Sequence, residues 1–172
     1  IDPLGSNRSA ENLAIKQGYA QILEMQKSGV LSEQASEQYL SSIGKARPDV
    51  VFELFQNEED MREALKGPGT DALVQKMAMD QPTKFFTDGA IRNLPDNKFG
   101  SAWGGWLEKD SDNASKWYFA NKEQLSTAQT DAIAASFSKF ALAKDEAESA
   151  LEWANSVHDE ELRKKLLSRV SK

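Results

Sequence analysis

The segment "AWGGWLEKDSDNASKW" (102–117) decides the fold, because its pattern returns later in the chain as "KFALAKDEAESALEW" (139–153). Each copy crosses a Lys-Asp pair and then reaches an alanine and a tryptophan. The copies are 36 residues apart at both positions, a spacing that fits two helices with their turns. The pattern therefore predicts a helical hairpin that recurs. The matched residues are Ala114 with Ala150 and Trp117 with Trp153.

An aromatic residue recurs at similar intervals further upstream. In "RPDVVF" (47–52) and "DQPTKFF" (80–86) a phenylalanine stands four residues after a proline. The whole aromatic series has steps of 34, 31 and 36 residues. A hairpin of this length cannot bury both of its faces alone, but stacked neighbours bury a continuous seam between them. The predicted repeat positions are Phe52, Phe86, Ala114, Trp117, Ala150 and Trp153.

Apolar residues spaced by three and four positions predict helices in the first part of the chain. The first predicted helix covers residues 7–27, and Gly29 suits the turn that ends it. A second helix is predicted over 32–43, with Ser32 as its N-cap. The apolar face of the first helix consists of Ile15, Tyr19, Ile22 and Leu23.

Residues 46–55 leave two interpretations open. Pro48 indicates the start of a helix, where its fixed φ and missing N–H are tolerated. The β-branched Val50 and Val51 lower helix propensity, so a strand is the competing interpretation. Further along, "GPG" (67–69) is the strongest break in the pattern.

The helical pattern becomes clearer in the second half of the chain. Residues 99–107 carry a full apolar stripe, and "STAQ" (126–129) matches a capping box ahead of the next helix. Asp145 and Glu148 give a similar start signal for the helix that holds the last tryptophan. The final helix has apolar residues at steps of four over 162–170. Since no segment alternates with a period of two, the predicted fold is all-α.

The predicted architecture is an α-α superhelix, or solenoid, of about three to five helical hairpins. A compact helical bundle is the alternative, because aromatic helices can also recur by chance in a bundle. We treat "IDPLGS" (1–6) as a loop or remnant outside the fold and 7–172 as a single repeat domain. Its predicted hairpin units cover approximately 7–45, 46–79, 80–109, 110–143 and 144–172.

Composition excludes several classes of function. The chain has 172 residues, of which 40% are hydrophobic and 28% charged, as expected of a folded, soluble protein. A net charge of −6 without a dense basic stripe disfavours nucleic-acid binding. There is no cysteine, and no apolar run approaches the length of about 20 residues that a membrane span needs. Because the chain begins at Ile1 without Met, we expect a processed or excised piece that an anchor or further repeats could precede.

The recurring residues resemble the α-α hairpin repeats of the tetratricopeptide and HEAT-like superfamily. The closest resemblance is to the "D-P-x-x-A-x-x-W" repeats of large uncharacterised bacterial proteins, which are often envelope-associated. It covers residues 46–172. Such families act mainly as binding scaffolds, so the resemblance implies a binding function and no enzyme, and it defines no functional residues. The residues that carry it are Asp80, Pro82 and Phe86; Asp110, Ala114 and Trp117; and Asp145, Ala150 and Trp153.

Aromatic residues near the recurring segments are candidates for a binding surface, since tryptophan and tyrosine dominate interaction hot spots. The predicted interaction surface consists of Trp103, Trp106, Tyr118 and Phe119. Gly104 and Gly105 interrupt this helix and cost about 1 kcal/mol each relative to alanine. Either a neighbouring helix packs tightly at these glycines, or they open a pocket beside the two tryptophans.

The remaining polar motifs do not form a recognisable catalytic, metal or cofactor site. His158 is the only histidine, and no cysteine could join it as a metal ligand, so we expect it to cap a helix or face solvent. The acidic runs 57–60 and 108–113 lack the spacing of a calcium loop, so we expect helix-capping and solvated carboxylates. "KGPGTD" (66–71) lacks the P-loop spacing and is predicted to form a turn.

These patterns favour a non-enzymatic protein–protein interaction module or a scaffold segment of a larger repeat protein. The expected partner is a protein or peptide on the curved inner surface of the stack, with no cofactor, metal or nucleic acid. Self-association through the C-terminal helix is also expected, because its apolar residues leave no polar capping face. The alternative is a helical bundle that binds a small apolar ligand in a Trp- and Phe-lined pocket. Both a bacterial envelope and a cytoplasmic location stay open. The apolar residues of that helix are Leu162, Leu166, Leu167 and Val170.

Overall fold

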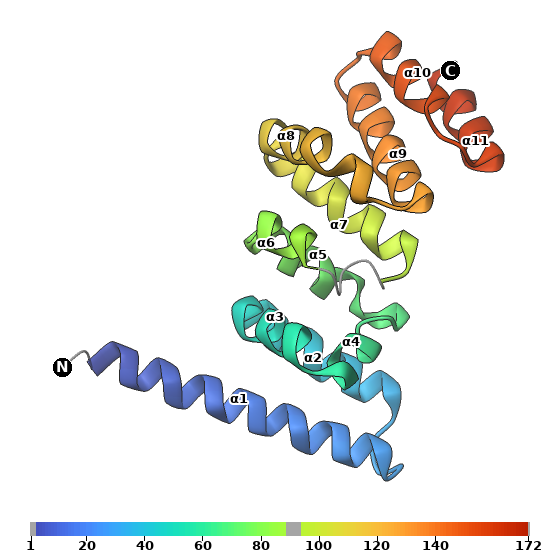
Figure 1. The fold of residues 1–172 in the computed structure, drawn as a ribbon. Helices are drawn as coiled ribbons and strands as arrows, with labels where there is room; N and C mark the ends of the chain where they lie inside the picture. Colours follow the sequence, from blue (N-terminus) through green and yellow to red (C-terminus); the bar gives the residue numbers. More distant parts are fainter. Residues whose placement is uncertain (1–2, 89–93, 172) are drawn as a thin grey trace. The chain divides into compact units, whose positions relative to one another are not determined.

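The computed structural model describes residues 3–88 and 94–171, with the side chains of 3–6 and 68 excepted. The regular elements of these residues are all helices joined by turns and loops, with no strand, which confirms the all-α prediction (Figure 1). Two compact units divide the chain, residues 1–80 (unit 1) and residues 81–172 (unit 2). The predicted hairpin boundaries stay a prediction.

Unit 1 is built around three mutually packed helices, α2, α3 and α5. Its core side chains include Val51, Phe55 and Met77, which are buried. The elements of unit 1 are α1 (Pro3–Lys27), α2 (Glu33–Ala46), α3 (Pro48–Asn57), α4 (Glu59–Ala64), the 3₁₀ turn η1 (Pro68–Thr70) and α5 (Asp71–Asp80).

Local sequence signals set most helix ends in unit 1. Ser32 caps α2, because its Oγ accepts a hydrogen bond from the N–H of Ala35 at 3.2 Å. Gly29 adopts a φ of 75° after α1, as a helix-ending glycine does. Pro48 is the first residue of α3, so the helical interpretation of residues 46–55 is confirmed and the strand is wrong. Burial of the two valines in the core outweighs their low helix propensity.

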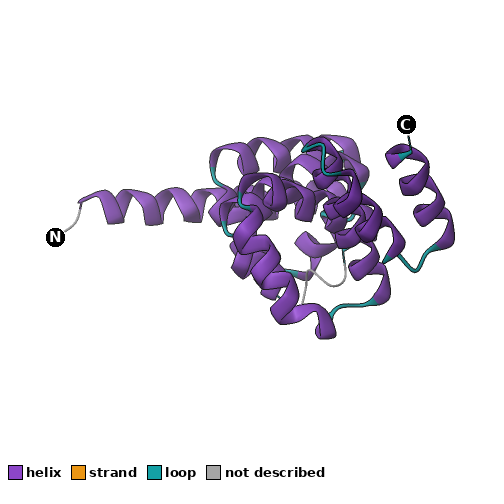
Figure 2. Ribbon diagram, turned by 90° about the horizontal axis from the view of Figure 1, so that it is seen from above, coloured by secondary structure: helices purple, strands orange, loops and turns teal. Residues whose placement is uncertain are grey.

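The N-terminal helix begins earlier than predicted. It starts at Pro3 rather than Asn7, so residues 3–6 are helical and not a loop. Proline suits the first helical position, because the N–H that it lacks would have no helical partner there. Residues 1–2 of the same predicted loop lie outside the described residues. The first turns of α1 extend beyond the other helices of unit 1 (Figure 2).

Helices α2 and α5 approach closely at Gly44. A methyl group at this position would overlap the side chain of Leu73, and both residues are buried. Only glycine therefore fits between these two helices without displacing a core side chain. The sequence pattern of α2 did not indicate this contact, because Leu73 lies in a different helix.

Unit 2 is organised around α9, which lies between α7 and α10 (Figure 1). Helix α8 packs on α7, and α11 packs on α10 and α9. The elements of unit 2 are α6 (Pro82–Thr87), α7 (Asp96–Lys109), α8 (Ser111–Asn121), the 3₁₀ turn η3 (Lys122–Gln124), α9 (Thr127–Ala143), α10 (Ala147–Asn155) and α11 (Glu160–Val170).

Capping signals in unit 2 are confirmed with one exception. Ser126 and Gln129 form the predicted capping box of α9, with reciprocal hydrogen bonds of 3.1 and 3.2 Å. Asp145, predicted to start α10, instead ends α9 at a φ of 62°. Its N–H donates to the carbonyl of Leu142, and the next N–H donates to that of Ala141, the pattern of a Schellman motif. The backbone hydrogen bonds of α9 thus determine the role of this aspartate.

The apolar face of α11 is covered by the chain itself. Leu166 is buried in a cluster with residues of α9 and α10, and Leu162 and Leu167 pack against that cluster. This removes the reason given for self-association through the C-terminal helix, because the apolar face that a second copy would cover already packs for the most part against α9 and α10. The buried members of the cluster are Ala134, Ala135, Ala154, Val157 and Leu166.

Candidate functional site

The apolar stripe predicted for residues 99–107 forms the centre of unit 2. Trp103 is 0% exposed and Trp106 is 1% exposed. Both are therefore core residues, which corrects their assignment to an interaction surface. Of the four residues predicted for that surface, only Tyr118 and Phe119 reach solvent. The buried stripe consists of Phe99, Ala102, Trp103, Trp106 and Leu107.

Phe86 of α6 joins this stripe through its ring. Its centroid lies 5.6 Å from Phe99, 5.1 Å from Trp103 and 5.3 Å from Trp106. The first two contacts are edge-to-face and the third is stacked, arrangements that the ring quadrupoles favour. Phe86, one of the predicted repeat positions, thus ties the short helix α6 to α7.

Two tryptophans from the recurring segments lie in comparable surroundings. Trp117 of α8 packs on Trp103 of α7, with ring centroids 5.6 Å apart. Trp153 of α10 stacks on Phe137 of α9 at 4.3 Å. Each tryptophan is half-buried and rests on an aromatic ring of the preceding long helix. The ring geometries differ, because the first pair is tilted by 48° and the second is stacked at 13°.

The alanines of the recurring segments lie in the interior of unit 2. Ala114 and Ala150 are both fully buried, each three residues before its tryptophan. Beside Ala150, the hydroxyl of Ser138 donates a hydrogen bond of 2.9 Å to the alanine carbonyl. This bond connects α9 to α10 at the point where the small side chain lets the two helices meet.

Unit 1 holds the first predicted repeat position, Phe52, in a different setting. Phe52 is buried and stacks on Phe55 of its own helix, with centroids 6.2 Å apart. This contact lies within one helix, whereas Trp117 and Trp153 contact neighbouring helices.

Three aromatic side chains of α8 and α10 form a cluster that reaches the surface, which we call the aromatic surface: Tyr118, Phe119 and Trp153. The centroid of Tyr118 lies 5.3 Å from Phe119 and 5.9 Å from Trp153. Phe119 is 58% exposed, and the other two are half-buried. Lys122 places its ammonium 6.0 Å from the centre of the Phe119 ring. An exposed phenylalanine supported by two larger rings has the composition of an interaction hot spot.

The glycines of α7 differ in the space beside them. A Cβ at Gly104 would lie 3.9 Å from the hydroxyl of Ser136, an ordinary contact. A Cβ at Gly100 would lie only 3.3 Å from the methyl group of Ala132. Of the two glycines for which tight packing was predicted, Gly105 is buried and Gly104 has only an ordinary contact, and a tighter contact than that of Gly104 lies one turn earlier, at Gly100.

A buried carboxylate of α9 fixes the loop between α10 and α11. Asp131 accepts hydrogen bonds from the backbone N–H of His158 at 2.9 Å and of Asp159 at 2.8 Å. The ring Nδ1 of His158 lies 2.9 Å from the same carboxylate. Burial alone would raise the pKa of Asp131, but the bonds from His158 and Asp159 outweigh it, so the pKa lies below its usual value.

His158 itself remains accessible. Its side chain is 70% exposed, as expected of a solvated residue next to a helix start. Asp159 provides the cap of α11, because its carboxylate accepts the N–H of Leu162 at 2.7 Å. Sequence analysis missed the role of Asp131, since nothing in the sequence of α9 indicates a loop 27 residues away.

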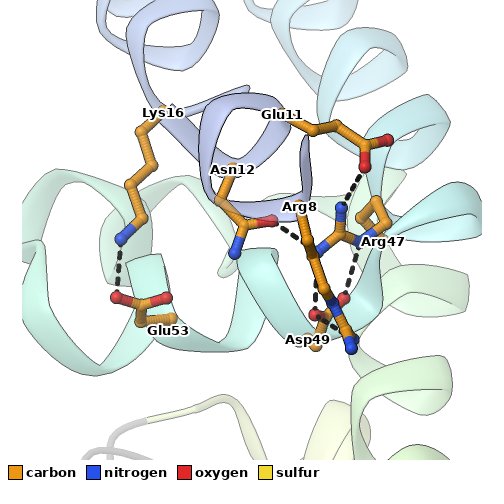
Figure 3. Close-up of polar contacts among 7 residues, drawn as sticks. All are labelled: Arg8, Glu11, Asn12, Lys16, Arg47, Asp49 and Glu53. Atoms are coloured by element: carbon orange, nitrogen blue, oxygen red, sulfur yellow. Dashed lines mark hydrogen bonds and ion pairs between the residues drawn. The ribbon is translucent and has the colours of Figure 1, made fainter. Parts of the chain in front are cut away.

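A polar cluster in unit 1 joins α1 to α3 (Figure 3). Arg47, whose side chain is 14% exposed, binds Asp49 through Nε and Nη2, both at 3.1 Å. It also binds Glu11 at 2.8 Å and donates to Asn12. Its hydrogen bonds to Asp49 raise the pKa of Arg47 and lower that of Asp49.

Further ion pairs extend this contact along α1. Lys16 binds Glu53 at 2.6 Å (Figure 3), and Lys27 binds Asp60 of α4 at 2.9 Å. Between these pairs Tyr19 is buried, and its hydroxyl has no hydrogen-bond partner among the described residues. Burial, followed by the charges of Asp60 and Glu58, raises the pKa of Tyr19. Ion pairs and the buried ring of Tyr19 thus hold α1 against the other helices of unit 1.

Other predicted motifs have structural roles. Asp110, in the second acidic run, caps α8 by accepting the N–H of Asn113 at 3.3 Å. In the turn at 66–71, the hydroxyl of Thr70 donates to the carbonyl of Leu65 at 2.9 Å. Within residues 3–88 and 94–171, no three His, Cys, Asp or Glu side chains group together as metal ligands would.

Comparison with known proteins gives no match: no family model, curated protein or solved structure matches the chain. The resemblance to helical-hairpin repeats therefore stays a prediction. Among the described helices, none combines the length and the apolar character that a membrane span requires.

Proposed function

We propose that this chain is a non-enzymatic protein-interaction module, built from stacked helical hairpins of the tetratricopeptide or HEAT-like kind. The contacts of unit 2 support this proposal. Helices α7 and α9 each carry core aromatics, and Trp117 and Trp153 each pack on one of these rings. In such a stack the chain serves as a scaffold segment, and its partner is a protein or a peptide.

The observation that carries the functional part is the exposure of Phe119 within the aromatic surface. A folded chain gains about 25 cal/mol for each Å² of apolar surface that it buries, so a largely exposed phenylalanine forgoes this gain. Tyr118 and Trp153 lie beneath and beside it and hold it in place. Rigid aromatic clusters of this kind supply large contact area at low entropic cost.

A random-peptide display library tests the proposal. We expect selection on the full chain to enrich peptides that bind wild type and lose binding to Phe119→Ala. The matched control is Leu13→Ala, which removes a side chain of similar exposure (57%) from unit 1 and should leave binding unchanged. If no enriched peptide distinguishes the two variants, the aromatic surface is not the binding site and the proposal fails.

A second candidate is a bundle that binds a small apolar ligand next to the buried tryptophans. It is favoured by the indole N–H groups of Trp103 and Trp106, which are buried without an acceptor among the described residues. A ligand with an acceptor atom in an apolar frame would satisfy them. Tryptophan fluorescence separates the two functions, because such a ligand should quench the emission of the wild type and much less that of Trp106→Phe.

A further inference from the structure

We propose that the partner of the aromatic surface is a cationic peptide segment, in which lysine or arginine side chains flank an apolar anchor. This inference rests on the proposed function and specifies the chemistry of the partner. It follows from the charges that border Tyr118, Phe119 and Trp153, and from how few of these charges are neutralised within the chain.

The border formed by α10 is strongly acidic. Residues 144–155, which include α10 and the turn before it, carry four carboxylates and a single cation, Lys144. All four side chains are exposed, and none forms an ion pair with another described residue. Trp153 stands on this same helix. The carboxylates are Asp145, Glu146, Glu148 and Glu152.

Helix capping explains only part of this charge. Carboxylates in the first turn, such as Glu148, are stabilised by the positive end of the helix dipole. Glu152 lies in the second half of the nine-residue helix, where the dipole disfavours a negative charge. No described residue forms an ion pair with Glu152, so no such pair offsets the small cost that the helix dipole imposes on its charge. A cationic partner would recover that cost.

The border formed by α8 and η3 adds no net positive charge. Lys116 and Lys122 are balanced there by Asp112 and Glu123. Besides burial, the charges of Asp131 and Glu123 raise the pKa of Tyr118, so negative potential also reaches the cluster from this direction. The surroundings of the aromatic surface are therefore net acidic, and an acidic partner would be repelled.

The aromatic rings themselves suit cations. Lys122 already places its ammonium near the face of Phe119, a contact of the cation–π type. Trp153 presents a larger ring of the kind that binds guanidinium and ammonium groups best, and it is supported from below by Phe137. A lysine or arginine of the partner can therefore contact a ring and a carboxylate together, while an apolar anchor covers Phe119.

The charge of the selected peptides and its effect on affinity test this inference. We expect Phe119-dependent peptides to carry a net positive charge and an aromatic or aliphatic anchor. Their affinity for Glu148→Gln/Glu152→Gln should fall by about three- to tenfold, and it should depend less on salt than the affinity for wild type. Glu24→Gln, which removes an exposed carboxylate from α1, is the matched control and should bind as wild type does.

Three results would overturn the inference in distinguishable ways. Phe119-dependent peptides that are neutral or acidic would refute the cationic partner and leave the interaction module standing. The absence of any Phe119-dependent peptide would refute both. A dimer in sedimentation experiments that Phe119→Ala dissociates would assign the surface to a second copy of the chain instead. Circular dichroism of each variant establishes that the fold is retained.

Discussion

Gly100 and Gly104 stand one turn apart on α7, but they have different reasons to be glycine. Gly100 lies where α9 comes closest, and a methyl group there would press on Ala132. Gly104 has room for a methyl group beside Ser136. Glycine inside a helix costs up to about 1 kcal/mol relative to alanine, so only Gly100 has a packing reason for that cost.

Gly104→Ala should therefore raise the free energy of unfolding by about 0.5–1 kcal/mol, since it removes backbone freedom from the unfolded chain without a clash. Gly100→Ala gains the same helix propensity, but its new methyl group must displace Ala132. It should therefore raise the free energy of unfolding by less than Gly104→Ala does, or lower it. Urea denaturation of both variants measures the difference. Equal stabilisation by the two substitutions would show that the approach of α7 and α9 is looser than described here.

Contacts that single residues make across the tertiary fold could not be predicted from the sequence. The stripe at 99–107 and the capping box at Ser126 were predictable, because local periodicity and local hydrogen bonding produce them. The contact of Gly44 with Leu73 and the bonds of Asp131 to the loop at His158 were not. Both join residues that only the tertiary fold brings together.

At the scale of elements, Asp131 connects three helices. It belongs to α9, and it accepts hydrogen bonds from two backbone N–H groups of the loop between α10 and α11, those of His158 and Asp159. Because the pKa of Asp131 is lowered in the folded chain, ionisation of this group stabilises the fold at neutral pH. This contribution is present above the pKa of an aspartate in the unfolded chain and is lost as the pH falls through the lowered folded-state pKa.

Asp131→Ala should lower the free energy of unfolding by about 1–3 kcal/mol, since it leaves two backbone donors without their acceptor. His158→Ala removes only the exposed ring and should cost much less. The difference between wild type and Asp131→Asn should shrink as the pH is lowered from 7 to about 3. Thermal denaturation across this range measures it, and a difference that grows on acidification would contradict the described role.

Helix α1 is held differently, because ion pairs provide much of its contact with unit 1. Pairs between exposed groups weaken with salt, since the Debye length falls to about 3 Å at 1 M. The pairs are spaced along the length of α1, at Glu11, Lys16 and Lys27. Its apolar contact is concentrated at Tyr19.

We therefore expect salt to loosen α1 before the other helices of unit 1. Raising sodium chloride to about 1 M should speed amide hydrogen exchange in α1 more than in α3. The effect of salt should be smaller in Lys16→Gln, which lacks the pair with Glu53. Exchange in α1 that does not respond to salt would show that burial of Tyr19 suffices to hold the helix.

For the whole molecule, the sequence predicted the helical class and most helix positions, because caps, prolines and apolar spacing are local signals. The repeat that the sequence suggests at Trp117 and Trp153 stays a prediction, although both side chains pack on an aromatic ring of a neighbouring helix. The sequence failed to separate buried from exposed aromatics: Trp103 and Trp106 were assigned to the surface, although both are buried. Periodicity identifies the apolar side of a helix, but it does not say how many neighbours cover it.

The central claim is that Trp117 and Trp153 occupy equivalent half-buried positions over a core that contains Trp103 and Trp106. Fluorine NMR of the chain labelled with 5-fluorotryptophan tests this most directly, with each signal assigned by a Trp→Phe variant. The account predicts that a soluble paramagnetic probe broadens the signals of Trp117 and Trp153 to a similar extent and leaves those of Trp103 and Trp106 sharp. Unequal broadening of the first two signals, or strong broadening of the last two, would contradict it.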